Sequence, residues 1–403
     1  MKMKNIIYVN YQKVIPPFII NEIKAVTTSV DNIFYVSRKL KKDNRKDAQF
    51  GKTIFIFSNC LNHFFCLLKL PFLFFGRKSL NNLKNARKHK KCNFRFIIKH
   101  IKYLYTESIL LSLLKKIDID FRNTTIVGCW FDVCSLASGT FSKIKNIPSI
   151  AFAHAFEINP KITKETGYLF DDLKFQYNDT VFFISENKRN DYFDYLAKEG
   201  LKFNVDKTSV RYLGTFCPNN LPEKSPEHIF TIVSCSSMVE VKRLHLIVDI
   251  LSKCKNKIKW IHIGDGPTAN FVKKYAFSKL QNSGVCFEFL GYLSQEQVLN
   301  FYQNNFVDLF INVSSSEGIP VSIMEAMSFS IPILATNVGG VCEIVDQNMG
   351  FLIDSSFCPD NVSKIIESYM DTDDSFKNKI RKESRKKWDN YFNIENNVID
   401  FYK

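Results

Sequence analysis

Short apolar runs alternate with longer amphipathic segments throughout the C-terminal half of the chain. The apolar runs are bounded by Gly, Pro, Asn and Ser and lie at Phe230–Cys235, Trp260–Gly264, Val285–Gly291, Asp308–Val313 and Ile331–Thr336. Helix-length segments follow them at Val241–Lys253, Ala269–Leu280, Gln295–Asn304, Val321–Phe329 and Gly339–Val345. Short apolar runs suit buried parallel strands, and their alternation with helices predicts a doubly wound α/β sheet.

The N-terminal half shows the same alternation less clearly. Its strand candidates are Ile6–Val9, Ile33–Val36, Ile54–Phe57, Thr125–Val127, Ile150–Ala153 and Val181–Ile184. Between the halves, residues 214–228 contain three prolines and no apolar period, which predicts a linker. We therefore expect two Rossmann-like α/β domains, residues 1–213 and 229–383, that face a central cleft.

Two apolar segments of the first half raise the question of a membrane. Phe64–Phe75 contains Lys69 and Pro71 and is too short for a span, which needs about 20 apolar residues. Downstream, apolar residues recur at helical spacing between Phe94 and Tyr105, with basic residues on the other faces. This pattern suits an interfacial helix on lipid and equally a helix whose apolar stripe packs on the core.

Charge separates the two halves. Residues 1–150 hold 27 Lys and Arg against eight Asp and Glu, whereas the rest of the chain holds 28 against 32. A compositional bias of the source would act on both halves alike, so we expect a functional basic face on the first domain. An anionic membrane is its favoured partner. Aromatic and basic residues are not interleaved as in single-strand nucleic-acid binders, so we expect no nucleic acid.

The eleven cysteines form no C-x-x-C pair and most lie in apolar runs, which favours buried, reduced thiols over disulfides or a zinc site. No N-terminal segment resembles a signal peptide. Together these features predict a cytoplasmic protein, peripheral on the inner face of the cell membrane. No metal-ligand spacing appears, so we expect no metal.

Candidate chemistry concentrates in Ser314–Val345. Pro320 suits the first turn of a helix, which leaves the amides around Gly318–Val321 free to face an anion. Glu317 and Glu325 are eight residues apart, at most about 12 Å along a helix, comparable to a diphosphate bridge. Each carboxylate can accept two hydrogen bonds from a vicinal diol. The alternative is a capping acid and a solvated surface glutamate.

This segment resembles the signature of family 4 retaining GT-B glycosyltransferases. The matching motifs are Glu317-Gly318-Ile319-Pro320, Glu325-Ala326 and Gly339-Gly340-Val341-Cys342-Glu343-Ile344. The resemblance implies that Glu317 contacts the donor sugar and Glu325 the ribose. It also implies that the donor site includes Gly318, Ile319, Pro320 and Val321.

The resemblance extends to three other segments. It implies that Lys242 holds the donor diphosphate, that the turn with Gly264 and Gly266 lines the cleft, and that His154 lies near the donor sugar. Ser237 stands where many members have an arginine, and Arg243 is a candidate substitute. The first loop contains prolines in place of glycines, and Ser330 also replaces a common glycine. A terminal helix over Ser384–Tyr402 would join residues 384–403 to the first domain.

These features predict a retaining, metal-independent glycosyltransferase with Glu317, His154 and Lys242 as catalytic residues. Its donor would be a nucleotide-diphosphate sugar and its acceptor a saccharide or lipid-linked saccharide, in surface polysaccharide biosynthesis, with no separate cofactor. Three alternatives stay open: an epimerase or phosphorylase of the same fold, a membrane- or partner-binding pseudoenzyme, and a nucleic-acid-binding module.

Overall fold

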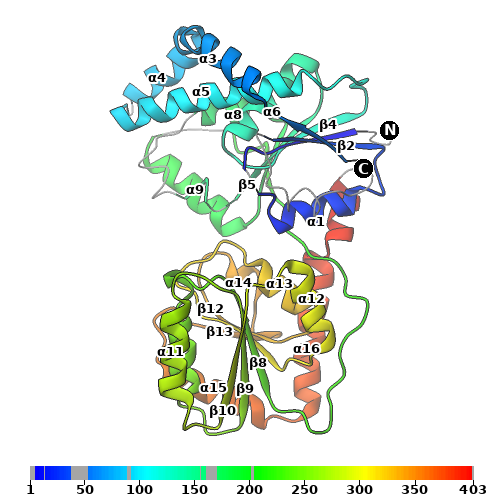
Figure 1. The fold of residues 1–403 in the computed structure, drawn as a ribbon, viewed down its shortest axis with the longest axis vertical. Helices are drawn as coiled ribbons and strands as arrows, with labels where there is room; N and C mark the ends of the chain where they lie inside the picture. Colours follow the sequence, from blue (N-terminus) through cyan, green and yellow to red (C-terminus); the bar gives the residue numbers. More distant parts are fainter. Residues whose placement is uncertain are drawn as a thin grey trace. The chain divides into compact units, whose positions relative to one another are not determined.

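The computed structural model describes residues 5–12, 14–37, 53–88, 92–154, 156–159, 170–200 and 204–401. The chain divides into two compact units (Figure 1). Unit 1 comprises Met1–Tyr212 and Glu395–Lys403, and unit 2 comprises Leu213–Ile394.

Unit 1 is a parallel sheet covered by helices. Its elements are β1 (Asn5–Val9), α1 (Pro17–Val26), β2 (Asn32–Ser37), β3 (Thr53–Phe57), α3 (Cys60–Phe75), α4 (Arg77–Lys88), α5 (Phe94–Leu114), β4 (Thr124–Gly128), α6 (Val133–Lys145), β5 (Ser149–Ala153), α8 (Asp171–Tyr177), β6 (Thr180–Phe183), α9 (Glu186–Lys198) and β7 (Thr208–Val210). Among the described residues, seven strands pair in the order β3-β2-β1-β4-β5-β6-β7. The strand order reverses between β1 and β4, which is the topological switch point of a doubly wound sheet.

The core of unit 1 forms where β1, β2 and β4 meet α5 and α6. Ile7, Val36 and Ile126 are fully buried against Leu110 and Phe141. Strands that are buried on both faces read as continuous apolar runs, which is why the sequence pattern located them.

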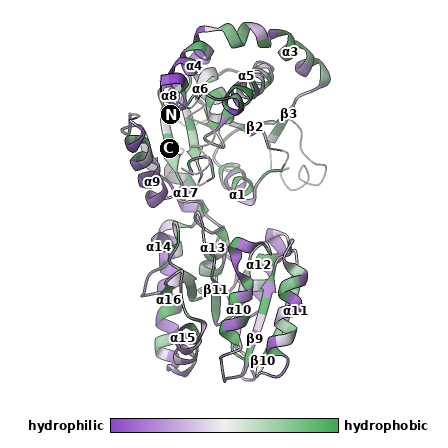
Figure 2. Ribbon diagram, turned by 90° about the vertical axis from the view of Figure 1, so that its left-hand side faces the viewer, coloured by the Kyte–Doolittle hydropathy of each residue, from purple (hydrophilic) through white to green (hydrophobic). Residues whose placement is uncertain are grey.

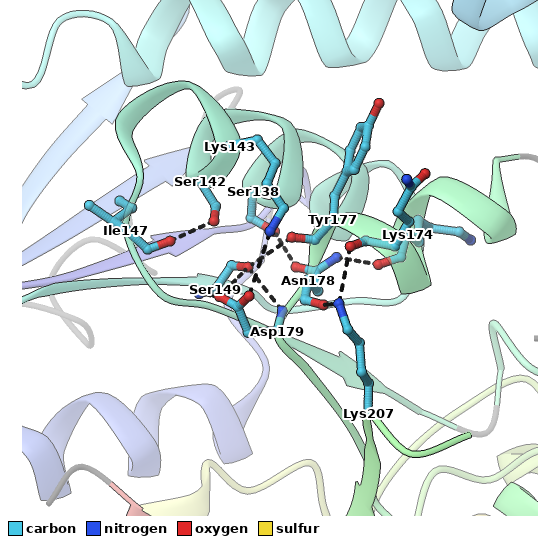
Figure 3. Close-up of polar contacts among 11 residues, drawn as sticks. Ser138, Ser142, Lys143, Ile147, Ser149, Lys174, Tyr177, Asn178, Asp179 and Lys207 are labelled. Atoms are coloured by element: carbon cyan, nitrogen blue, oxygen red, sulfur yellow. Dashed lines mark hydrogen bonds and ion pairs between the residues drawn. The ribbon is translucent and has the colours of Figure 1, made fainter. Parts of the chain in front are cut away.

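Asn178 and Asp179 tie the end of α8 to two neighbouring elements (Figure 3). The Asn178 amide donates to the carbonyls of Ser135 on α6, at 3.0 Å, and of Lys174, at 2.7 Å. The Asp179 carboxylate accepts from the backbone N–H of Ser149 on β5 at 2.9 Å. These contacts fix the start of β6, the strand that follows β5 in the sheet.

Unit 2 has the same architecture. Its elements are β8 (Thr231–Cys235), the 3₁₀ turn η1 (Glu240–Lys242), α10 (Leu244–Leu251), β9 (Ile258–Ile263), α11 (Ala269–Leu280), β10 (Val285–Gly291), α12 (Gln295–Asn304), β11 (Leu309–Asn312), α13 (Val321–Ser328), β12 (Ile333–Thr336), α14 (Val341–Ile344), β13 (Gly350–Ile353), α15 (Pro359–Asp371) and α16 (Asp374–Tyr391). In the described part of this unit, six parallel strands pair in the order β10-β9-β8-β11-β12-β13. The order reverses between β8 and β11.

The predicted terminal helix is interrupted. Instead of one helix over 384–402, α16 ends at Tyr391 and α17 (Ile394–Phe401) begins after a break, while Tyr402 lies outside the described residues. The break arises because Thr215 pairs with this backbone. Its N–H donates to the Phe392 carbonyl at 2.9 Å and its carbonyl accepts from the Ile394 N–H at 3.0 Å. Backbone groups that bond to Thr215 cannot continue the helical ladder.

Burial distinguishes the two interpretations of the Phe94–Tyr105 stripe. Leu104 is buried in a cluster with Phe170, and Ile97, Ile101 and Tyr105 are half-buried. Most of the stripe therefore packs on the core, and only Phe94 and Ile98, 77% and 50% exposed, point to solvent. Within the described ranges, every helix is too short or too polar to cross a bilayer.

Candidate functional site

The loops after β8 and β11 bring Lys242 and Glu317 into direct contact. These two strands are neighbours at the switch point of unit 2, where α/β sheets bind ligands beyond their carboxyl ends. The Lys242 Nζ atom lies 2.6 Å from Glu317 Oε1. Asn312, the last residue of β11, donates its side-chain amide to the same oxygen at 3.2 Å. One carboxylate thus accepts from a lysine and an amide while the Lys242 side chain stays 22% exposed.

The backbone of the Gly339-Gly340 turn packs against the loop that contains Glu317 and Gly318. Gly339 has φ +57°, and a Cβ atom there would lie 1.8 Å from the Glu317 carbonyl oxygen. The Gly340 N–H donates to the Gly318 carbonyl at 2.9 Å. Gly339 therefore allows close backbone approach, which only a residue without a side chain permits at this conformation.

The N-terminus of α13 follows the loop directly. Pro320 is the residue before the first helical position and provides no side-chain cap. None of the hydrogen bonds within the described part of the chain takes its donor from the amides of Ile319, Val321 or Ser322. Free amides at a helix N-terminus attract an anion such as phosphate.

Glu325 is buried on α13, so it is not a solvated surface glutamate. It is 7% exposed, and its Oε1 accepts from Gln295 Nε2 at 2.9 Å. Burial raises the pKa of Glu325 to about 7, although the Gln295 hydrogen bond opposes the shift. The charges of Glu325 and Lys242 both affect the thiol of Cys235, the last residue of β8. Burial raises the pKa of the Cys235 thiol, the Glu325 charge raises it further and the Lys242 charge lowers it. Both charged groups therefore act on the end of β8.

Gly264 and Gly266 let the loop after β9 pack tightly on the loop after β8. Their φ values are +141° and +159°. An added Cβ would lie 1.9 Å from the Ser236 carbonyl oxygen at Gly264 and 2.6 Å from that of Met238 at Gly266. These glycines position the loop that leads to Lys242, and their contact with a donor stays a prediction.

Arg243 has contacts that differ from the predicted donor contact. Its guanidinium donates to the backbone carbonyls of Val313 at 2.7 Å, Ser314 at 3.1 Å and Ser355 at 2.8 Å. It also lies over the ring of Phe357 at 5.7 Å. A guanidinium occupied by three carbonyls favours a structural role that joins three loops, and a contact of Arg243 with the donor stays a prediction.

His154 follows β5 in unit 1 and is buried among aromatic rings. Its ring centroid lies 4.5 Å from that of Trp130 and 5.0 Å from that of Phe18. Its Nδ1 atom is 3.6 Å from Glu157, whose carboxylate pKa is raised by burial. The structure thus gives the imidazole an acidic neighbour, and its catalytic role stays a prediction.

Asn312 and Gln295 are site residues that the sequence did not single out. Asn312 had a signal, since it is a polar residue in an otherwise apolar strand. Gln295 had none, because nothing in the sequence indicates that α12 lies beside α13. In the described ranges no group of three His, Cys, Asp or Glu side chains is placed to hold a metal ion. A cavity of about 810 Å³ in unit 2 lies elsewhere, lined by residues such as Asp346, Phe351 and Tyr369.

Comparisons with known proteins address the family and the fold of the chain. Residues 220–388 match the family model "Glycosyl transferases group 1". The O-antigen biosynthesis glycosyltransferase WbnH of Escherichia coli is 28% identical over 171 residues, 42% of this chain and 46% of the relative. The putative colanic acid biosynthesis glycosyltransferase WcaL of Escherichia coli is 26% identical over 187 residues, 42% of this chain and 44% of the relative. The chain therefore spans just under half the length of these curated relatives.

Solved structures match the whole fold. Anabaena Alr3699/HepE in complex with UDP and glucose has a TM-score of 0.65 at 16% identity, covering 99% of this chain and 98% of that one. The lipopolysaccharide outer core galactosyltransferase WaaB has a TM-score of 0.63 at 16% identity, with full coverage of both chains. The two Rossmann-like units thus define the GT-B fold. The family match is confined to residues 220–388, which lie within unit 2.

Proposed function

We propose that the chain is a retaining glycosyltransferase that uses a nucleotide-diphosphate sugar. The observation that carries the proposal is the contact of Lys242 and Asn312 with Glu317 beside the free amides of α13. The lysine and the amides offer positive charge to a diphosphate, and the carboxylates offer acceptors to hydroxyl groups. The relatives' names, which refer to O-antigen and colanic acid biosynthesis, support surface polysaccharide as the product. The acceptor in this proposal is a saccharide or lipid-linked saccharide.

In the proposed reaction the acceptor oxygen bonds to the anomeric carbon on the face from which the diphosphate leaves. The bond between that carbon and the diphosphate oxygen breaks, and the hydroxyl proton passes to the departing diphosphate. Lys242 and the α13 amides stabilise the developing negative charge electrostatically. Lys242 is paired with Glu317, so donor binding would exchange this pair for a lysine–diphosphate contact and free the carboxylate for the sugar.

A ligand-binding experiment tests the donor site directly. A ligand that binds the native state raises the melting temperature. We expect a UDP-, GDP- or ADP-sugar to raise it for the wild-type protein and to do so much less for Lys242→Ala. Lys259→Ala is the matched control, because Lys259 pairs with Glu288 at 3.3 Å on the surface of the same unit.

Product analysis tests the reaction. Incubation with the stabilising donor and saccharide acceptors should give a product whose anomeric configuration, read by NMR, equals that of the donor. An inverted product would contradict retention. A conversion of the donor alone, without acceptor, would instead indicate an epimerase. Loss of all turnover after EDTA treatment would contradict the proposed metal independence.

A further inference from the structure

Helix α3 is rich in hydrophobic residues (Figure 2), and many of their side chains are exposed to solvent. Six large side chains recur at the spacing of one helical face and are 55–82% exposed: Leu61, Phe64, Phe65, Leu68, Phe72 and Phe75. Residues spaced by three and four positions lie above one another on one side of a helix. The solvent side of α3 is thus apolar, where an ordinary surface helix is polar.

The opposite side of α3 is packed against the rest of unit 1. Cys66 is buried, and Leu70 and Phe74 pack on the cluster around Phe96. Two of its polar residues, Asn62 and His63, also face α5, whereas Lys69 is exposed. His63 Nδ1 lies 2.8 Å from the Tyr105 hydroxyl of α5. Asn62 bonds to α5 in the same way, with its amide 3.4 Å from Ser112 Oγ.

A helix that is apolar on all sides belongs in a protein core or in lipid. Large exposed apolar patches mark interaction surfaces on folded proteins. Because α3 has 16 residues and contains Pro71, it cannot span a bilayer, but it can lie along one.

The surroundings of the stripe are basic. Residues 53–106 contain no Asp or Glu and eleven Lys and Arg. Exposed basic side chains lie on α3, α4 and the first turns of α5: Lys69, Arg77, Lys84, Arg87, Lys88, Arg95, Lys99 and Lys102. Within the described residues none of these eight takes part in an ion pair. The exposed Phe94 and Ile98 lie on the same turns of α5, next to the C-terminal half of α3, since the Phe74 and His100 rings are 6.0 Å apart.

We propose that α3 inserts its Leu61–Phe75 stripe into an anionic lipid surface, with the surrounding lysines and arginines on the headgroups. Apolar insertion and basic flanks are the two components of interfacial helix binding. A second copy of this chain fits the stripe less well. A symmetric dimer places the same patch of both copies together and would bring two acid-free basic surfaces into contact. The proposal is independent of the donor site in unit 2.

Vesicle binding by the full chain tests the proposal. We expect the wild-type protein to sediment with vesicles of phosphatidylcholine mixed equally with phosphatidylglycerol, and far less with phosphatidylcholine alone. Phe72→Glu should lower the partition coefficient about tenfold or more, because it removes a phenyl ring that would be buried in the lipid and adds a charge. Phe277→Glu on α11 is the matched control. Phe277 is 63% exposed in unit 2, and its replacement should leave binding unchanged.

Tryptophan fluorescence can measure insertion in a variant that still binds the vesicles. The emission of Phe72→Trp, after subtraction of the wild-type signal, should shift to the blue on anionic vesicles and be quenched by brominated lipid. Lys242→Ala should bind vesicles normally, so that failure of the donor site and failure of this surface are distinguishable. Unchanged binding of Phe72→Glu would overturn the proposal. So would a wild-type dimer without lipid that Phe72→Glu dissociates, since the stripe would then be an interface between copies.

Discussion

The switch points of the two sheets carry different side chains at the same topological position. In unit 1, Asn10 follows β1, is fully buried, donates to the Tyr35 hydroxyl and accepts from Trp130 at 3.1 Å. In unit 2, Lys242 follows β8, stays partly exposed and pairs with Glu317. The first arrangement is closed by neutral protein groups, and the second presents charges that a ligand can reach.

This difference shows that two units with the same fold can have different functions. Unit 2 has at its switch point the charged groups and free amides that suit a diphosphate. At its own switch point, unit 1 has a buried polar network around Asn10 and a helix that begins at Pro17. Many of its exposed apolar side chains lie on α3 instead. The predictions below test this division, from the largest expected effect to the smallest.

Glu317→Ala should abolish most transfer if unit 2 holds the chemistry. Loss of a group that acts on the transition state lowers kcat by about 10²–10³-fold. We expect this loss with an unchanged circular dichroism spectrum, measured by initial rates of donor turnover. Glu288→Ala, which breaks the surface pair with Lys259, should keep the wild-type rate. Near-normal turnover by Glu317→Ala would remove the assignment of the site to this loop.

Gly339→Ala should destabilise unit 2 much more than a comparable change in unit 1. At Gly339 the new Cβ would overlap the Glu317 carbonyl, whereas at Gly200, with φ +71°, nothing lies within 4 Å. Gly200→Ala therefore carries only the left-handed backbone cost of about 1–2 kcal/mol. Urea unfolding of both variants measures the difference. Equal losses would show that the Glu317 loop adapts to the added methyl group.

Arg243→Ala should lower the stability of unit 2 without removing donor binding. Hydrogen bonds from a charged group contribute about 2 kcal/mol, and this guanidinium makes three of them to backbone carbonyls. The free energy of unfolding and the ligand-induced melting shift are the two measurements. A lost melting shift in a stably folded variant would return Arg243 to the donor site.

Glu325 should make unit 2 less stable as the pH rises. Its pKa of about 7 lies above the ordinary value of 4.5, so the folded state holds a proton that the unfolded chain releases. Stability from this group is complete below pH 4.5 and falls between pH 4.5 and 7, by about 1.4 kcal/mol per pKa unit. Glu325→Gln should remove this slope in urea unfolding across that range. A slope shared by both proteins would assign it to other groups.

Ser330→Gly should give the smallest change, a gain in stability. Ser330 has φ +60°, which strains a residue with a side chain. Relief of a left-handed conformation contributes about 1 kcal/mol, part of which the greater entropy of unfolded glycine offsets. Thermal unfolding would detect the gain. No gain would indicate that the serine side chain compensates for its backbone strain.

The sequence by itself determined the α/β class, the GT-B fold, most strand positions and the segment that holds Glu317. The sequence predicts buried parallel strands, glycine turns and a proline at a helix start, because the conformation of each depends on only a few consecutive residues. The short strands β7 and β13 were not predicted, since their apolar runs are brief. The break before α17 was also missed, because it depends on pairing with the distant Thr215.

Tertiary structure alone decided three matters. It turned Arg243 towards carbonyls, since they come from loops that are remote in the sequence. It placed Gln295 beside Glu325. The sequence could not predict this contact, because neither helix carries a pattern that identifies its neighbour. It also decided the surroundings of two apolar helices, burying much of the α5 stripe and exposing that of α3. An apolar stripe specifies that it will be covered, but only packing decides whether protein or another phase covers it.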